Sequence, residues 1–182
     1  DRSPSRGLGD VYKRQTLGNA GWFWIVLAVL MLTVLPKKYK KAGLTMAIAL
    51  ILSLIFCNGI MKHLWARPRA FWVVGQNFVV GNEFENLYGI FNSIHDYSFP
   101  SGHSSASFAA AVSIFMWRKK EGSAALVLAA LIAFSRLYFT VHYPTDVLVG
   151  TITGALYGVA AYFIVKALMN KDPKLNAIFN KQ

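Results

Sequence analysis

The amino-acid sequence predicts an all-α membrane protein, a polytopic bundle with five transmembrane helices. Of its 182 residues, 55% are hydrophobic and only 15% are charged, a balance unusual for a soluble domain. The charged residues also avoid five apolar runs, which cover residues 22–35, 43–61, 104–117, 122–135 and 147–165. An α-helix rises about 1.5 Å per residue, so the longest runs approach the thickness of the hydrocarbon core of a bilayer. The shorter runs can reach that thickness if their helices continue into flanking polar residues.

Three regions of different character follow from this pattern. Residues 1–15 lack an initiating Met, are rich in Arg, Gly and Ser, and contain no apolar run, so we expect a non-native or disordered leader there. Residues 16–170 carry all five runs and are predicted to form one membrane domain. Residues 171–182 are predicted to form a cytoplasmic tail.

The first helix is predicted to cross the membrane inward over residues 22–35. Trp22 and Trp24 lie near its start, where indole rings commonly anchor helices at the outer interface. A lysine-rich turn follows, and residues 43–61 return to the outer side. Residues 71–97 then interleave aromatic side chains with few charges, so we expect short helices or loops along the interface. Those aromatic side chains either guide a lipid toward a site or pack onto the helices.

The last three helices are predicted over residues 104–117, 122–139 and 147–165. The turn between the first two is short, so these helices should be neighbours, and Pro144 is well placed in the first turn of the third. Gly150, Gly154 and Gly158 recur every four residues along that last helix. We interpret this stripe as a surface that a partner helix can approach closely.

The net charge of +11 is concentrated in three segments that alternating crossings place on one side of the membrane. They contain Lys37, Lys38, Lys40 and Lys41, then Arg118, Lys119 and Lys120, and finally Lys166, Lys171, Lys174 and Lys181. The positive-inside rule makes this side cytoplasmic. We interpret the basic segments as topology signals, with contact to anionic lipid headgroups as a second role. A nucleic-acid partner is disfavoured, because it would need one exposed basic face.

Three polar clusters fall on the opposite side, within residues 62–69, 101–103 and 136–146. Outside the first fifteen residues, every Lys and Arg on that side belongs to one of them, namely Lys62, Arg67, Arg69 and Arg136. Ionisable residues in such positions usually mark a functional site. Four cations beside a helix N-terminus suit a phosphate dianion and the charge that develops on it during transfer.

The second and third clusters carry residue types suited to phosphoryl chemistry. Ser101 is a good N-cap, Gly102 lets backbone approach a ligand, and the free N–H groups of a helix start attract anions. His103 lies in the first turn, where it could pass a proton to or from a bound group. Asp146 lies one turn beyond His142. Its carboxylate can accept a hydrogen bond from one imidazole nitrogen and leave the other as nucleophile or base.

A metal centre is the alternative interpretation of the same side chains. Its candidate ligands are His63, His95, His103, His142 and Asp146. The histidines form no pairs four residues apart, no cysteine assists, and the surrounding cations would repel a metal ion. We therefore expect no metal and no other cofactor, and interpret His63 and His95 as incidental polar residues.

The three clusters together resemble the three signatures of the type 2 phosphatidic acid phosphatase family, which is related to bacterial acid phosphatases and vanadium haloperoxidases. The matching motifs are Lys62-x6-Arg69, Tyr97-Ser98-Phe99-Pro100-Ser101-Gly102-His103 and Ser135-Arg136-x5-His142-x3-Asp146. The first departs from the family pattern, because Ala70 follows Arg69 where the family has proline. The dipeptide Arg67-Pro68 supplies that pair two residues early, so either arginine is a candidate, and the spacing from Lys62 favours Arg69.

The resemblance implies a fold and a role for each motif residue. Integral members typically have six helices around an acid phosphatase/haloperoxidase-like core, so five here fits loss of the first. His142 would attack phosphorus and form a phosphohistidine, Asp146 would orient it, and His103 would protonate the leaving oxygen and then activate water. The phosphoryl oxygens would be held by Lys62, Arg69, Arg136, Ser101 and the Gly102 backbone, with Arg67 as the alternative arginine.

The expected function is therefore metal-independent dephosphorylation of a lipid phosphate or diphosphate. The resemblance implies an integral protein of the bacterial cell membrane, surrounded by membrane lipids, with its site open to the outer face. Undecaprenyl diphosphate and phosphatidylglycerol phosphate are the two candidate substrates, and a soluble phosphate ester is a weaker one. The alternative from a different class is a non-catalytic protein that binds or transports lipid phosphates on the same fold.

Overall fold

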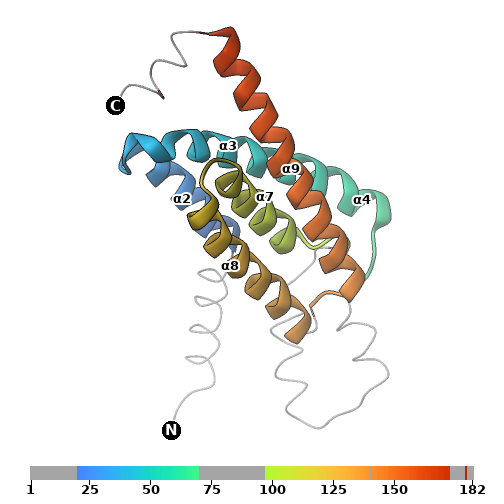
Figure 1. The fold of residues 1–182 in the computed structure, drawn as a ribbon. Helices are drawn as coiled ribbons and strands as arrows, with labels where there is room; N and C mark the ends of the chain where they lie inside the picture. The colour runs from blue at the N-terminus through green and yellow to red at the C-terminus, as the bar shows by residue number, and fades with distance from the viewer. Residues whose placement is uncertain (1–19, 70–96, 140, 173–178, 180–182) are drawn as a thin grey trace, which may run out of the picture.

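The computed structural model describes residues 20–69, 97–139, 141–172 and 179, and each regular element within these ranges is a helix (Figure 1). The α-helices are α2 (Ala20–Thr33), α3 (Lys40–Leu52), α4 (Lys62–Trp65), α7 (Gly102–Trp117), α8 (Lys119–Tyr138) and α9 (Pro144–Lys171). They are joined by a short 3-10 helix, η1 (Lys37–Tyr39), and a π-helix, η2 (Ser53–Met61). The predicted leader, the interface segment before Tyr97 and most of the predicted tail lie outside the described residues.

The predicted all-α membrane bundle is confirmed, and the described residues contain a helix at each of the five predicted positions. Elements η1, α3, η2 and α4 join into one continuous helical body, Lys37–Trp65. This body, α8 and α9 are each long and apolar enough to cross a bilayer, and α2 is a shorter apolar helix. Helix α9 is the clearest case of extension beyond an apolar run, because it continues from Pro144 as far as Lys171.

Helix α7 lies at the centre of the bundle, with α2, α3, α8 and α9 packed around it (Figure 1). Most of its buried side chains are small, and these include Ser104, Ser105, Ser107, Ala109, Ala110 and Ala111. Small side chains let helix backbones approach closely, which is how helices associate in a bilayer. This packing holds the N-terminus of α7 against η2 on one side and the start of α9 on the other.

The predicted role of the glycine stripe on α9 is also confirmed. A methyl group on Gly158 would lie 2.9 Å from the carbonyl oxygen of Ala109, and one on Gly154 would collide with the carbonyl oxygen of Ser105. Gly150 faces the Ser101 carbonyl in the same way. The three glycines therefore follow α7 along its length, and each lies against backbone of α7 or of its N-cap.

Gly154→Ala is expected to destabilise the protein by about 1–3 kcal/mol, because backbone cannot move aside as the tip of a flexible side chain would. The matched control is Gly59→Ala, where the added methyl group meets only the Leu54 carbonyl oxygen at an ordinary 3.6 Å. Thermal unfolding of both variants in the same detergent measures the difference. Equal melting temperatures for the two variants would contradict the close α7–α9 contact.

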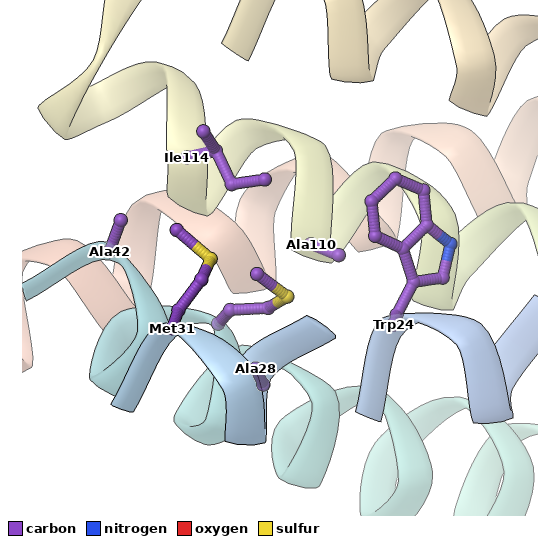
Figure 2. Packing of buried hydrophobic residues seen from close by; sticks show 7 residues of the cluster. Trp24, Ala28, Met31, Ala42, Ala110 and Ile114 are labelled. Atoms are coloured by element: carbon purple, nitrogen blue, oxygen red, sulfur yellow. The ribbon is translucent and has the colours of Figure 1, made fainter. Parts of the chain in front are cut away.

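A hydrophobic core fills the space between α2, α3 and α7 (Figure 2). Its buried residues are Trp24, Ala28, Met31, Ala42, Met46, Ala110 and Ile114. The prediction that Trp24 anchors the outer interface is wrong, since only 1% of this residue is exposed. Its indole N–H donates to Ser107 Oγ at 3.0 Å, which satisfies the polar end of a buried ring. Trp22, at 62% exposure, does face outward.

The two basic turns before α3 and before α8 lie together at one end of the bundle. The Tyr39 hydroxyl donates to Glu121 at 3.3 Å, and Arg118 forms an ion pair with the same carboxylate at 2.6 Å. Lys41 lies over the ring of Trp117, 5.5 Å from its centroid. Because Trp117 ends α7, the N-terminus of this helix at Gly102 is at the opposite end from the basic turns.

Candidate active site

The N-terminus of α7 is capped and tied to the start of α9. Ser101 is the N-cap, as predicted, and its side-chain oxygen accepts from the Ser104 N–H at 3.4 Å and from the Ser104 hydroxyl at 3.0 Å. The Ser101 N–H donates to the Asp146 carbonyl oxygen at 2.9 Å. Gly102 and His103, the first residues of α7, are therefore held beside the first turn of α9.

A polar cavity of about 250 Å³ opens at this end of α7. Five of the residues that line it were predicted from the three motifs, namely Lys62, Arg69, Gly102, His103 and His142. The other three are Gly21, Asn58 and Ala106. Three segments that are distant in the sequence thus meet at one small volume, and both imidazoles line it.

Two cations are buried in the wall of this cavity. Lys62 is only 6% exposed and Arg69 only 8%. The Arg69 guanidinium lies 3.3 Å from the Val141 carbonyl oxygen and 3.5 Å from His142 Nε2. Burying positive charge in an apolar bundle is costly, and an anion bound in the cavity would offset that cost.

His142 is oriented by Asp146 from behind. Its Nδ1 lies 3.5 Å from Asp146 Oδ2, and the Ser98 hydroxyl donates to the same oxygen while lying 3.4 Å from Nδ1. Asp146 is fully buried and also accepts from the Tyr143 N–H at 2.9 Å. With Nδ1 held in this way, Nε2 is the ring nitrogen that faces Arg69 and the cavity.

Burial is the main cause that lowers the pKa of His142 below its ordinary value of 6.5. The nearby cations Arg69 and Lys62 act in the same direction, and the hydrogen bond with Asp146 opposes them. A lowered pKa keeps the ring neutral at pH 7. A neutral ring that donates from Nδ1 keeps its lone pair on Nε2, the atom that faces Arg69 and the cavity, and a nucleophile or a base requires such a lone pair.

The two arginines of the first motif occupy different positions. Arg69 lines the cavity, whereas the guanidinium of Arg67 donates to Asp146 Oδ1 and to Thr145 Oγ1, each at 2.8 Å. The guanidinium of Arg67 also lies 3.9 Å from the centroid of the Tyr143 ring. Arg67 therefore supports the carboxylate behind His142 and is not among the residues that line the cavity.

Two further predicted site residues lie near the cavity without lining it. Arg136 is in the last turn of α8, where its guanidinium contacts Ser135 Oγ at 3.2 Å and interacts electrostatically with His103. Ser101 is fully buried, and its side-chain oxygen serves the cap of α7. His63, interpreted as incidental, is exposed with its ring against Tyr97.

Sequence reasoning missed two contributions to the site. Ser98 belongs to the second motif, but only the folded chain brings its hydroxyl to Asp146. Asn58 lies in a mostly apolar run, where the sequence pattern alone predicts no functional role. One signal was available, because Asn58 precedes Lys62 by four residues and side chains with that spacing share a helix face.

The described part of the chain holds no cluster of three or more His, Cys, Asp or Glu side chains that could bind a metal ion. The charged groups around the polar cavity include two buried cations and one buried carboxylate, which already has hydrogen-bond donors. This arrangement suits an anionic ligand better than a cation.

Comparison with known proteins gives one family and several relatives. Residues 38–170 match the PAP2 superfamily. The chain is 29% identical to the undecaprenyl-diphosphatase of Sulfolobus acidocaldarius over 74% of its own length and 59% of that protein. It is 30% identical to the lipid A 4'-phosphatase of Bacteroides thetaiotaomicron, over 80% of the chain and 65% of that relative. The bacitracin transport permease protein BcrC of Bacillus licheniformis is 38% identical over 40% of the chain and 36% of its own length. The chain thus spans less than two thirds of each of these curated relatives.

Proposed function

The chain belongs to the PAP2 superfamily, and on this premise we propose that it hydrolyses a lipid phosphate or diphosphate without a metal ion. The observation that carries the proposal is the position of His142. Its Nδ1 is held by Asp146, and its Nε2 faces a cavity that Lys62, Arg69 and the N-terminus of α7 make electropositive. A neutral nucleophile in an electropositive cavity suits attack on a phosphoryl group.

The first step of the proposed reaction forms a phosphohistidine. His142 Nε2 attacks phosphorus, and the bond between phosphorus and the leaving oxygen breaks. His103 donates its proton to that oxygen, so the alcohol or phosphate product leaves without an added charge. The hydrogen bond from His142 Nδ1 to Asp146 stabilises the positive charge that the attacking ring acquires.

The second step releases phosphate. His103, now neutral, takes a proton from a water molecule, whose oxygen attacks phosphorus as the bond to His142 Nε2 breaks. Lys62, Arg69 and the free N–H groups at the start of α7 hold the phosphoryl oxygens through both steps. Fixed cations supply the electrostatic stabilisation that a metal ion provides in other phosphatases.

We assign the phosphate-binding role of the first motif to Arg69 and a positioning role to Arg67. Arg69→Gln is expected to lower kcat/KM by about 10²–10³-fold and to weaken inhibition by inorganic phosphate, since Arg69 lines the cavity. Arg67→Gln is expected to lower kcat while inhibition by phosphate stays near the wild-type value. Steady-state kinetics with phosphate as inhibitor compare the two variants, and the reverse pattern would exchange the two roles.

The proposed site opens at the outer face of a bacterial cell membrane. Support comes from the basic turns, which lie at the opposite end of α7 and belong on the cytoplasmic side by the positive-inside rule. The substrate class follows from the relatives, whose names specify undecaprenyl diphosphate and lipid A. Undecaprenyl diphosphate and phosphatidylglycerol phosphate are the two substrates to test first.

A non-catalytic protein that binds or transports lipid phosphates is the second candidate, and the name of the transport permease relative favours it. Binding alone does not require a second imidazole beside an oriented nucleophile, so the pair formed by His103 and His142 favours catalysis. The deciding experiment measures phosphate release from both lipids in detergent with EDTA present. Release by the wild-type protein supports hydrolysis. Lipid movement across vesicles without release would support the transport protein and refute our proposal.

A further inference from the structure

A second cavity, of about 370 Å³, lies between α2 and the α3–η2 segment. Its walls are almost entirely apolar, and four of the side chains that form them, Ile25, Val29, Ile51 and Leu54, are also exposed on the surface of the bundle. The second cavity therefore opens sideways, on the apolar outer surface of the bundle that the described residues form.

The apolar cavity and the polar cavity meet. Gly21, Asn58 and Ala106 line both of them. A molecule with a phosphate head and a hydrocarbon chain could therefore place its head against Lys62 and His142 while its chain continues between α2 and α3. At the junction of the two cavities, the polar head of such a molecule would give way to its hydrocarbon chain.

Asn58 is the polar side chain at this junction. Its carboxamide lies against the Cα of Gly102, because a methyl group there would be 2.5 Å from Asn58 Oδ1 and 3.4 Å from Nδ2. Asn58 precedes Lys62 by four residues, so both project from the same side of the η2–α4 segment. Among the described residues, the Asn58 carboxamide has no hydrogen-bond partner, although it stands next to the start of α7.

We propose that Asn58 is a substrate-binding residue at the junction and that the apolar cavity holds the hydrocarbon chain of the substrate. The inference rests on the proposed lipid phosphatase function and deepens it. The Asn58 N–H donates to the oxygen atoms that join the reacting phosphoryl group to the chain. In a monoester this is the ester oxygen, and in a diphosphate it is an oxygen of the second phosphate.

An amide suits this position better than a charged group. It donates a hydrogen bond to a leaving group that becomes more negative as its bond to phosphorus breaks, and it adds no charge where the cavity turns apolar. A side chain at position 102 would displace the Asn58 carboxamide from its place beside the start of α7.

The test compares Asn58→Leu, which keeps the shape but removes the donor, with Gly59→Ala, an exposed neighbour outside both cavities. For Asn58→Leu we expect kcat/KM with undecaprenyl diphosphate to fall about tenfold, as for the loss of one hydrogen bond. Inhibition by inorganic phosphate should change less than twofold, because free phosphate has no second phosphate group for the Asn58 carboxamide to bind. Gly59→Ala should match the wild type in both measurements.

A second variant tests the chain cavity independently. Ala47 lines only the apolar cavity, so Ala47→Phe should lower kcat/KM for the lipid and leave that for p-nitrophenyl phosphate, which has no chain, unchanged. Asn58→Leu with wild-type activity on the lipid would overturn the inference, as would equal losses on both substrates for Ala47→Phe. A wild-type protein that releases phosphate from no lipid would refute the proposed function itself, and the inference with it.

Discussion

Replacing His142 with alanine is expected to abolish phosphate release, with a loss of about 10⁴–10⁶-fold in kcat. The alanine variant has no group that can form the covalent intermediate, because the nitrogen removed is Nε2, the atom that faces Arg69 and the cavity. Substrate binding should persist, since the buried cations Lys62 and Arg69 remain.

The matched control is His63→Ala, which removes an imidazole from an exposed position outside the cavity. Both variants are assayed in detergent with EDTA on the same lipid diphosphate. In a second measurement the reaction is quenched rapidly, and the amount and acid stability of the phosphate bound to the protein are determined. We expect His63→Ala to retain wild-type activity and His142→Ala to carry no bound phosphate. A His142→Ala protein that releases phosphate as fast as His63→Ala would refute the nucleophile assignment.

The sequence was sufficient to predict the helices and the convergence of the three motifs. Apolar runs give the helices because few other arrangements satisfy backbone hydrogen bonds in a bilayer. Alternating crossings then bring one end of each helix to the same side, so Lys62, His103 and His142 were expected together, and all three line one cavity. The glycine stripe of α9 was predictable for the same reason, since its spacing matches the helical repeat.

Other features depend on distances that no sequence pattern supplies. Trp24 is of a residue type that is common at membrane interfaces, and it lies near the end of a helix. It is nevertheless buried, and its indole N–H donates to Ser107 on a different helix, a contact that the sequence does not show. The two arginines of the first motif are only two residues apart, yet they occupy different positions. Helix α4 ends just before them, and Ala66 at its C-cap adopts a left-handed conformation with φ of 40°, which turns the chain before Arg67. The π-helix that carries Asn58 likewise has no marker in the sequence.

The second large effect is expected for Asp146→Asn, which should lower kcat by about 10⁴-fold. The carboxylate accepts from Arg67, Tyr143, Ser98 and His142 Nδ1, all of which present hydrogens. An amide must turn its NH₂ group toward some of these donors, so the imidazole loses its orientation and the positive charge of the phosphohistidine loses its counter-ion. The matched control is Thr145→Val, which removes only the other acceptor of Arg67 and should change kcat little.

The pH profile separates this positioning role from a general loss of structure. Because burial lowers the pKa of His142, we expect the acid limb of kcat/KM in the wild type to fall below pH 6.5. The hydrogen bond with Asp146 opposes that shift, so removing the carboxylate should lower the pKa further and move the acid limb to still lower pH. Partial unfolding would reduce kcat without moving the limb. An acid limb that stays in place or moves to higher pH in Asp146→Asn would contradict the assigned contact between this carboxylate and the nucleophile.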